Sequence, residues 1–125
     1  MSLEVTVKGS PVAWRKRPKG GTYDTWVNQL LAALREQPLV QPYYDVRLEF
    51  TLGPKAFDVL NLENPNAADL DNLCKVVLDA LKGTVFRTAP GGDSAVLRLS
   101  AVKMKVPSDE GAGVRILVAG GLPEP

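Results

Sequence analysis

The stretch at residues 46–52, Val-Arg-Leu-Glu-Phe-Thr-Leu, decides the fold class of this chain. Apolar and polar side chains alternate along it, which predicts an extended strand with one buried face and one face in water. A shorter alternation at residues 3–7 and two later stretches, at residues 95–105 and 113–119, predict further strands. Several half-buried strands form a sheet whose apolar face must be covered by another layer.

Two segments with a helical period supply that layer. We expect one helix around residues 24–37, with Thr22 or Asp24 capping its start, and a second over residues 70–82, ended by Gly83. Apolar side chains recur every three or four positions in both, at Trp26, Leu30, Ala33 and Leu34 and at Leu70, Leu73, Cys74, Val77 and Leu81. The expected order of elements is therefore β-α-β-α-β-β.

This order predicts a single α+β (mixed α/β) domain over residues 1–125, with one mixed sheet and two helices packed on it. The order of the strands within the sheet stays open, because alternation shows which face is buried and not which strands pair. Between the elements we expect a basic arm at residues 9–22, loops at residues 53–68 and 84–93, and a frayed tail at residues 120–125.

The amino-acid composition excludes several kinds of chemistry. The 125 residues include no histidine and a single cysteine, Cys74. Catalytic triads, histidine general bases and histidine-held metals are therefore excluded, as is structural zinc, which needs four soft ligands. An enzyme built from this chain must use carboxylates, lysines or hydroxyl groups, and carboxylates prefer hard cations such as Mg²⁺ or Mn²⁺.

The same composition bears on where the protein acts. Its apolar runs are too short to span a bilayer, and its first residues lack the basic and apolar regions of a secretory signal. A single cysteine cannot form an intrachain disulfide, which fits a reducing compartment. We therefore expect a cytoplasmic protein with no membrane partner and no small organic cofactor.

The densest polar cluster lies at the start of the second predicted helix. Asp71, Lys75 and Asp79 are spaced four residues apart, so they share one helical face. Asp69 and Asp71 would diverge inside a helix, but they can converge on one ion if Asp69 lies at or just before the N-cap. Two carboxylates followed by a lysine one turn later then form a candidate cation site with an ammonium group facing a phosphate.

A purely structural interpretation of these acids stays open. Acidic residues stabilise a helix N-terminus by capping it and through the helix dipole, by ~0.3–2 kcal/mol each. An Asp–Lys pair four residues apart is a common surface feature that is worth ~0.2–0.5 kcal/mol. We interpret Asp79 as a solvated or hydrogen-bonded helix residue rather than a ligand.

The cluster also has a specific order of residue types. It runs Asp69-x-Asp71-Asn72-Leu73-x-Lys75 and is followed by Asp79-Ala80-Leu81, Gly83-x-Val85-Phe86, Asp93-Ser94-x-Val96 and Lys103. This arrangement resembles the central motif and later Asp box of the RusA family of Holliday junction resolvases. The first segment matches the family's opening more loosely, at Gly9-x-Pro11, Arg17-Pro18 and Tyr23. The similarity spans most of the chain.

By this resemblance, Asp69, Asp71 and Asp93 are the metal-binding carboxylates and Lys75 is a catalytic lysine. The family acts as a homodimer that makes paired, Mg²⁺-dependent cuts at four-way DNA junctions, and Mn²⁺ is expected to substitute. The resemblance thus implies a metal-dependent endodeoxyribonuclease of recombination and repair. The residue chemistry agrees, because carboxylates can hold an ion that polarises the scissile phosphate and a lysine can stabilise the charge that develops on it.

One departure from the family pattern affects this interpretation. The family has an acidic doublet where this chain has Gly92-Asp93, so the first acid of the doublet is missing. We align Asp93 with the second acid because Val96 then falls on the valine of the motif. If that alignment is wrong, the metal site has lost a ligand and the protein is a non-catalytic module that binds junctions without cutting them.

The basic arm has two interpretations. Its cations, Arg15, Lys16, Arg17 and Lys19, are either a solvated charge run or contacts to DNA phosphates. Trp14 and Tyr23 either stack on bases at the junction centre or belong to the core, and we assign Phe86 to the core.

Taken at face value, the formal net charge of +1 argues against a nucleic-acid partner. It is the sum of opposed regions, because residues 1–20 carry a net charge of +4 and residues 58–93 a net charge of −3. A basic arm beside an acidic cation site suits a nuclease. A more distant alternative is a small protein-interaction domain whose helix acids serve only as caps.

Overall fold

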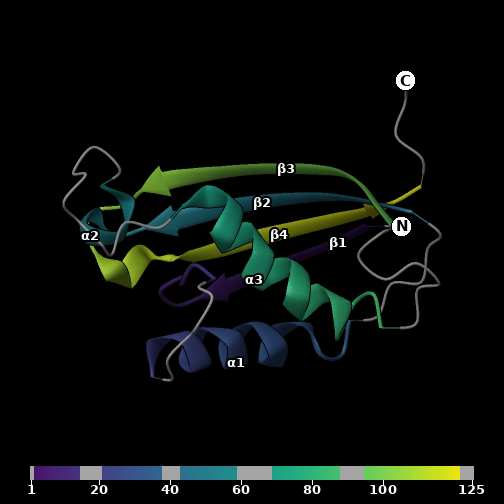
Figure 1. Cartoon of the computed structure of the whole chain (residues 1–125), viewed down its shortest axis with the longest axis horizontal. Coiled ribbons are helices and arrows are strands. Elements are labelled where there is room, and N and C mark those ends of the chain that lie inside the picture. Colours follow the sequence, from purple (N-terminus) through teal and green to yellow (C-terminus); the bar gives the residue numbers. More distant parts are fainter. Residues whose placement is uncertain (1, 15–20, 38–42, 59–68, 88–94, 122–125) are drawn as a thin grey trace.

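A computed structural model describes residues 2–14, 21–37, 43–58, 69–87 and 95–121. Four strands form one sheet: β1 (Ser2–Lys8), β2 (Tyr44–Leu52), β3 (Val96–Lys105) and β4 (Gly113–Gly120). The helices are α1 (Thr22–Leu34), α2 (Pro54–Phe57) and α3 (Leu70–Lys82), and a short 3₁₀ turn, η2, spans Asp109–Gly111. The predicted α+β class and the order of the main elements are confirmed (Figure 1).

The sheet is mixed and has the strand order β1-β4-β2-β3. Strand β4 pairs antiparallel with both β1 and β2, whereas β3 pairs parallel with β2 at the edge. Strands β1, β2 and β3 therefore point the same way, and their C-terminal ends lie at one end of the sheet (Figure 1). The helix α3 connects two parallel strands, so it runs back against their direction.

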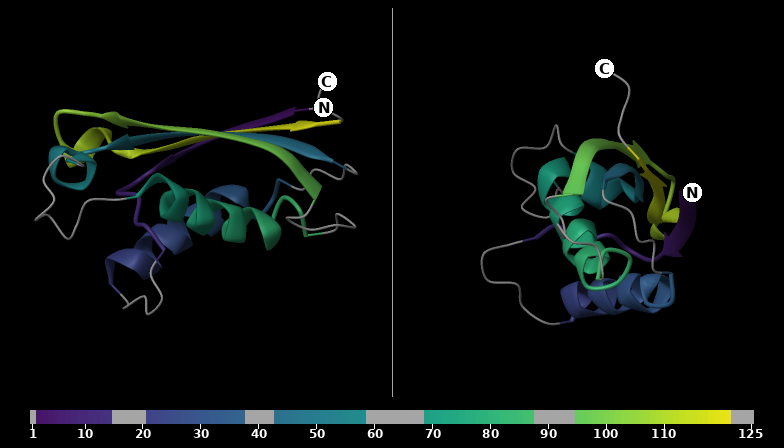
Figure 2. Two further views of the ribbon diagram at one scale, coloured as in Figure 1. Left: turned by 45° about the horizontal axis from the view of Figure 1, so that its top comes forward. Right: turned by 90° about the vertical axis from the view of Figure 1, so that its right-hand side faces the viewer.

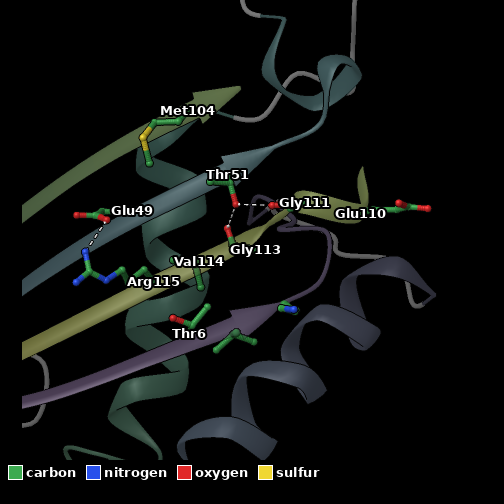
Figure 3. Close-up of a pocket in the computed structure, with 12 residues that line it drawn as sticks. Thr6, Glu49, Thr51, Met104, Glu110, Gly111, Gly113, Val114 and Arg115 are labelled. Carbon is green, nitrogen blue, oxygen red and sulfur yellow. Dashed lines mark hydrogen bonds and ion pairs between the residues drawn. The ribbon is translucent and has the colours of Figure 1, made fainter. Parts of the chain in front are cut away.

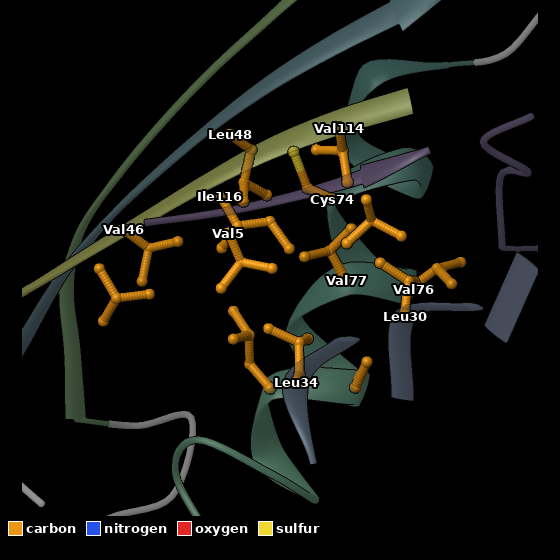
Figure 4. Close-up of a cluster of buried hydrophobic side chains, with 14 of the residues drawn as sticks. Val5, Leu30, Leu34, Val46, Leu48, Cys74, Val76, Val77, Val114 and Ile116 are labelled. Carbon is orange, nitrogen blue, oxygen red and sulfur yellow. The ribbon is translucent and has the colours of Figure 1, made fainter. Parts of the chain in front are cut away.

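Helices α1 and α3 cover one face of the sheet, as the side view shows (Figure 2). The inward side chains of the strands meet the apolar stripes of both helices in one core (Figure 4), formed by residues that include Val5, Leu30, Leu34, Val46, Leu48, Leu73, Val77 and Ile116. Phe86, assigned to the core from the sequence, is buried there, and its ring lies 4.3 Å from that of Tyr44. No helix among the described residues is long and apolar enough to cross a membrane.

The opposite face of the sheet is open and carries cross-strand ion pairs. Arg115 on β4 contacts Glu4 on β1 and Glu49 on β2, at 2.7 and 3.2 Å. The hydrogen bond to Glu4, followed by the one to Glu49, raises the pKa of Arg115. Arg98 on β3 pairs with Asp45 on β2 at 3.1 Å. These exposed pairs favour the observed register more than they add to stability.

Two local predictions were wrong. Helix α1 begins at Thr22, and neither Thr22 nor Asp24 caps it. Its N-cap is Gly21, whose φ of 67° lies in the left-handed region that glycine adopts without strain. The loop expected at residues 53–68 contains the short helix α2, with Pro54 in its first turn, and residues 59–68 lie outside the described residues.

Candidate active site at the start of helix α3

Helix α3 places the two acids of the motif at its first turn. Its side chains Leu73, Cys74, Val76, Val77, Ala80 and Leu81 are buried against the sheet and α1, whereas Asp71, Lys75 and Asp79 are exposed. The shared face predicted for these three polar residues is thus the solvent side of the helix.

Asp69 is the N-cap residue of α3, with extended backbone angles (φ −73°, ψ 135°). This is the position at which its carboxylate can approach that of Asp71, because the chain has not yet entered helical geometry. The side chain of Asp69 makes no capping hydrogen bond, and it is exposed. Its oxygens are therefore not occupied in stabilising the helix start.

Asp71 is held by one local contact. The backbone N–H of Asn72 donates a hydrogen bond to Oδ1 of Asp71, at 2.9 Å. The second carboxylate oxygen remains available for another partner, since Asp71 takes part in no ion pair within the described part of the chain. Oxygen donors from two carboxylates are the ligands that Mg²⁺ and Mn²⁺ prefer, so these residues fit a hard divalent cation.

Lys75 lies one turn further along α3, and its ammonium group does not pair with either neighbouring acid. Its Nζ lies 3.5 Å from the centre of the Trp14 ring. Trp14 comes from the segment after β1, whose backbone is tied to the first turn of α3 by a hydrogen bond from Trp14 N–H to the Asn72 carbonyl, at 3.0 Å. Sequence reasoning considered Trp14 for base stacking or the core but missed this contact.

Cys74 does not compete with the carboxylates for this chemistry. Burial, and secondarily the negative charge of Asp71, raise the pKa of its thiol above the ordinary value of 9.0. A protonated, buried thiol is neither a nucleophile nor a metal ligand at neutral pH. The chemistry of the site therefore belongs to the exposed carboxylates and to Lys75.

Five of the residues predicted for the site lie outside the described residues: Asp93, Arg15, Lys16, Arg17 and Lys19. Within the described ranges, no three acidic or cysteine side chains are gathered closely enough to hold a metal ion. Asp69 and Asp71 are thus the two described carboxylates of the candidate site, and any third protein ligand would come from outside the described residues of this chain.

The course of α3 bears on where that ligand comes from. The first turn of α3 accepts a hydrogen bond from the N–H of Trp14. Phe86, just after the last turn of α3, packs on Tyr44 at the start of β2. Tyr44 pairs with Val96, so the start of β3 lies at the far end of α3 from Asp69. A helix of 13 residues is about 20 Å long.

A pocket on the protein lies apart from this acidic turn. This pocket measures about 320 Å³ and opens on the other face of the sheet, beside Thr6, Glu49 and Arg115 (Figure 3). The Thr51 hydroxyl donates to the carbonyl of Gly111 at 3.0 Å, which closes the rim of the pocket. The candidate site is therefore an exposed surface, suited to a large substrate rather than to an enclosed small molecule.

The fold and the site together define a class of protein: a small mixed-sheet domain that presents carboxylate oxygens and an ammonium group at the start of a crossover helix. The sequence model of one family, described as endodeoxyribonuclease RusA, matches residues 5–119. The chain therefore belongs to the RusA endodeoxyribonuclease family, as its motif indicated. A search of curated proteins found no match to it.

Proposed function

We propose that this protein is a metal-dependent endodeoxyribonuclease that resolves four-way DNA junctions by paired phosphodiester hydrolysis, in cytoplasmic recombination and repair. One observation carries the proposal: in a chain of the RusA family, Asp69 and Asp71 stand exposed at the first turn of α3, and among the described residues neither takes part in an ion pair. Asp69, the N-cap residue, makes no capping hydrogen bond, and Asp71 accepts the Asn72 N–H on one of its two oxygens, which leaves the other oxygen for a further partner. An N-cap acid that served only to cap the helix would be hydrogen-bonded to the helix start.

Asp69 and Asp71 would hold Mg²⁺, or Mn²⁺ in its place, and such an ion polarises a phosphate and lowers the pKa of a bound water. The chain itself contributes geometry and charge. The N-terminal end of α3 gives the two carboxylates a rigid base, because the turn that follows is packed in the core. Lys75 would stabilise the negative charge that develops on the scissile phosphate.

The basic arm would supply affinity for DNA. Arg15, Lys16, Arg17 and Lys19 follow directly on Trp14, which is bonded to the first turn of α3. The cations of the arm therefore follow, in the chain, a residue that is bonded to the acidic turn. Contacts from its cations to phosphates add binding energy that does not depend on sequence, which suits an enzyme that recognises a branched structure.

The third carboxylate, Asp93, would come from a second copy of the chain. Covalent geometry ties Asp93 to Ala95, two residues later, and two residues span at most about 7 Å. Ala95 directly precedes β3, at the far end of α3 from Asp69. A carboxylate of the same chain would have to return along most of the helix, whereas a two-fold partner can bring its own Asp93 to the acidic turn.

The edge strand β3 supports such a homodimer. Leu97, Leu99, Val102 and Met104 are each between 42% and 44% exposed, and they are four of the five large exposed apolar residues among those described. Among the described residues, no strand pairs with the outer side of β3, so its backbone groups there can pair with another chain.

An antiparallel β3–β3 pairing about a two-fold axis would serve the proposed site. It would bring the start of β3 in one copy beside the end of β3 in the other copy. The first turn of α3 in that other copy also lies at this end. Centred on Ser100, the pairing would place Arg98 opposite Val102 and no two cations directly opposite each other. Two active sites related by a two-fold axis match the symmetry of a four-way junction.

Cleavage of a synthetic four-way junction tests the proposal. Wild-type protein is expected to cut the junction in Mg²⁺ or Mn²⁺ and to leave a linear duplex of the same sequence intact. Asp71→Asn should abolish cleavage while junction binding stays equal or becomes tighter, because a negative charge near phosphate is removed. Asp79→Asn, on the same exposed face, is the matched control and should keep activity.

The Gly92-Asp93 departure from the family doublet favours one alternative, a module that binds junctions without cutting them. Wild-type protein that binds the junction and leaves it uncut across the metal series would establish that alternative. Unchanged cleavage by Asp71→Asn would instead refute the assignment of the site to the first turn of α3.

A further inference from the structure

The Lys75 ammonium lies against an aromatic ring although two acids are within its reach. Asp71 and Asp79 stand four residues before and after it on the same exposed face, which is the spacing at which helical ion pairs form. Within the described part of the chain, Lys75 nevertheless forms no ion pair with either acid, and the ion pairs of Arg98 and Arg115 join strands of the sheet. Lys75 instead places Nζ 3.5 Å from the ring centre of Trp14.

The Trp14 ring is well fixed for this contact. Its backbone N–H is bonded to the Asn72 carbonyl at 3.0 Å, and its half-buried side chain packs against the edge of the core. Lysine, by contrast, has a long flexible stem that can place its charge in many positions. The ring therefore determines where the ammonium lies, and not the reverse.

We infer that Trp14 is a positioning residue, whose ring holds the Lys75 ammonium away from the Asp71 carboxylate and so keeps both groups available for their separate partners. The inference rests on the proposed function, in which Asp71 takes a divalent cation and Lys75 faces a phosphate. Without the ring, Lys75 would pair with Asp71 and compete with the cation for the same oxygens.

The strength of the ion pair that Lys75 would form with Asp71 sets the size of the effect. An exposed pair four residues apart on a helix corresponds to roughly a 2-fold change in an equilibrium constant, and Mn²⁺ must compete with it once the ring is gone. Loss of the ring by Trp14→Leu should therefore weaken Mn²⁺ binding by roughly 2- to 3-fold. Trp14→Phe retains a smaller aromatic face and should lie between wild type and Trp14→Leu. The backbone bond to Asn72 is kept in both variants because it uses main-chain atoms.

Two measurements on the full chain test the inference. The first is the proton chemical shift of the Lys75 ε-methylene group, which is bonded to Nζ and which the ring current of the indole should move upfield, because Nζ lies 3.5 Å from the ring centre. Lys82, in the last turn of the same helix, is the internal reference. The second is calorimetric titration with Mn²⁺ of wild type, Trp14→Leu, Lys75→Met and the double variant.

We expect an upfield Lys75 resonance in the wild type. Trp14→Leu should bind Mn²⁺ more weakly than the wild type, and this difference should disappear when Lys75→Met is also present. A wild-type Lys75 resonance at the position of Lys82 would overturn the inference, and this result does not depend on any variant folding. An equal loss of Mn²⁺ affinity with and without Lys75→Met would overturn it as well. Wild-type protein that shows the shifted Lys75 resonance but cleaves no junction would contradict the proposed function alone.

Discussion

Replacing Asp69 by alanine separates a helix cap from a metal ligand. An aspartate that caps a helix contributes about 1 kcal/mol to stability, within a range of 0.5–2 kcal/mol. The Asp69 side chain makes no capping bond, so only its interaction with the helix dipole is lost, which is worth ~0.3–1 kcal/mol at an exposed position. Relief of the repulsion between Asp69 and Asp71 acts in the opposite direction. We therefore expect a net change of about 0.5 kcal/mol or less in the free energy of unfolding without metal.

Urea denaturation measures this change with and without Mg²⁺. With an m value of about 2 kcal/mol/M, a loss of 0.5 kcal/mol moves the midpoint by roughly 0.25 M. A ligand at ten times its dissociation constant stabilises the folded state by about 1.4 kcal/mol, which is roughly 0.7 M in the midpoint. Wild type should show this Mg²⁺-dependent shift, and Asp69→Ala should lose it.

Asp24→Ala is the matched control, because Asp24 is an exposed acid in the first turn of α1. It removes a similar helix-dipole interaction and should leave the Mg²⁺-dependent shift unchanged. The reasoning is refuted if Asp69→Ala destabilises the metal-free protein by 1 kcal/mol or more, of the order of a true cap, and keeps the full Mg²⁺ shift.

Two other predictions concern the arm and the buried thiol. Reversing the charges of Arg15 and Arg17 to glutamate should weaken junction binding and flatten its dependence on salt concentration, as measured by fluorescence anisotropy from low to high salt; an unchanged salt slope would return the arm to a solvated loop. Because the folded state raises the pKa of Cys74, its proton is held more tightly in the folded than in the unfolded chain, so stability is unaffected at neutral pH and falls as the pH rises above about 9. Cys74→Ala should flatten this decline in the unfolding midpoint, and an identical alkaline decline in wild type and variant would argue against it.

The main elements could be predicted because their patterns are long and regular. The alternation at residues 46–52 matches β2, and the apolar period from Leu70 to Leu81 matches α3. The strand order could not be predicted, because alternation shows which face is buried and contains no information on pairing. The helix α2 was missed because its four residues are too few to show a period.

The candidate site likewise has a part that the sequence could predict and a part that it could not. The residue types and spacing of Asp71, Lys75 and Asp79 are local, so the sequence alone indicated their shared face. The contact between Trp14 and Lys75 joins residues far apart in the chain, and it depends on how the segment after β1 meets α3. The direction of α3 relative to β3, which led us to place Asp93 on a partner chain, is likewise a property of the folded topology.

Mixed dimers test the central claim most directly. If each active site combines Asp69 and Asp71 of one chain with Asp93 of the other, then Asp71→Asn and Asp93→Asn should each be inactive alone. Mixing them creates heterodimers in which one site carries both substitutions and the other carries none. The account predicts that the mixture regains Mg²⁺-dependent nicking of one strand of a four-way junction. A mixture that stays inactive while wild type cleaves, with heterodimer formation verified by mass spectrometry, would contradict it.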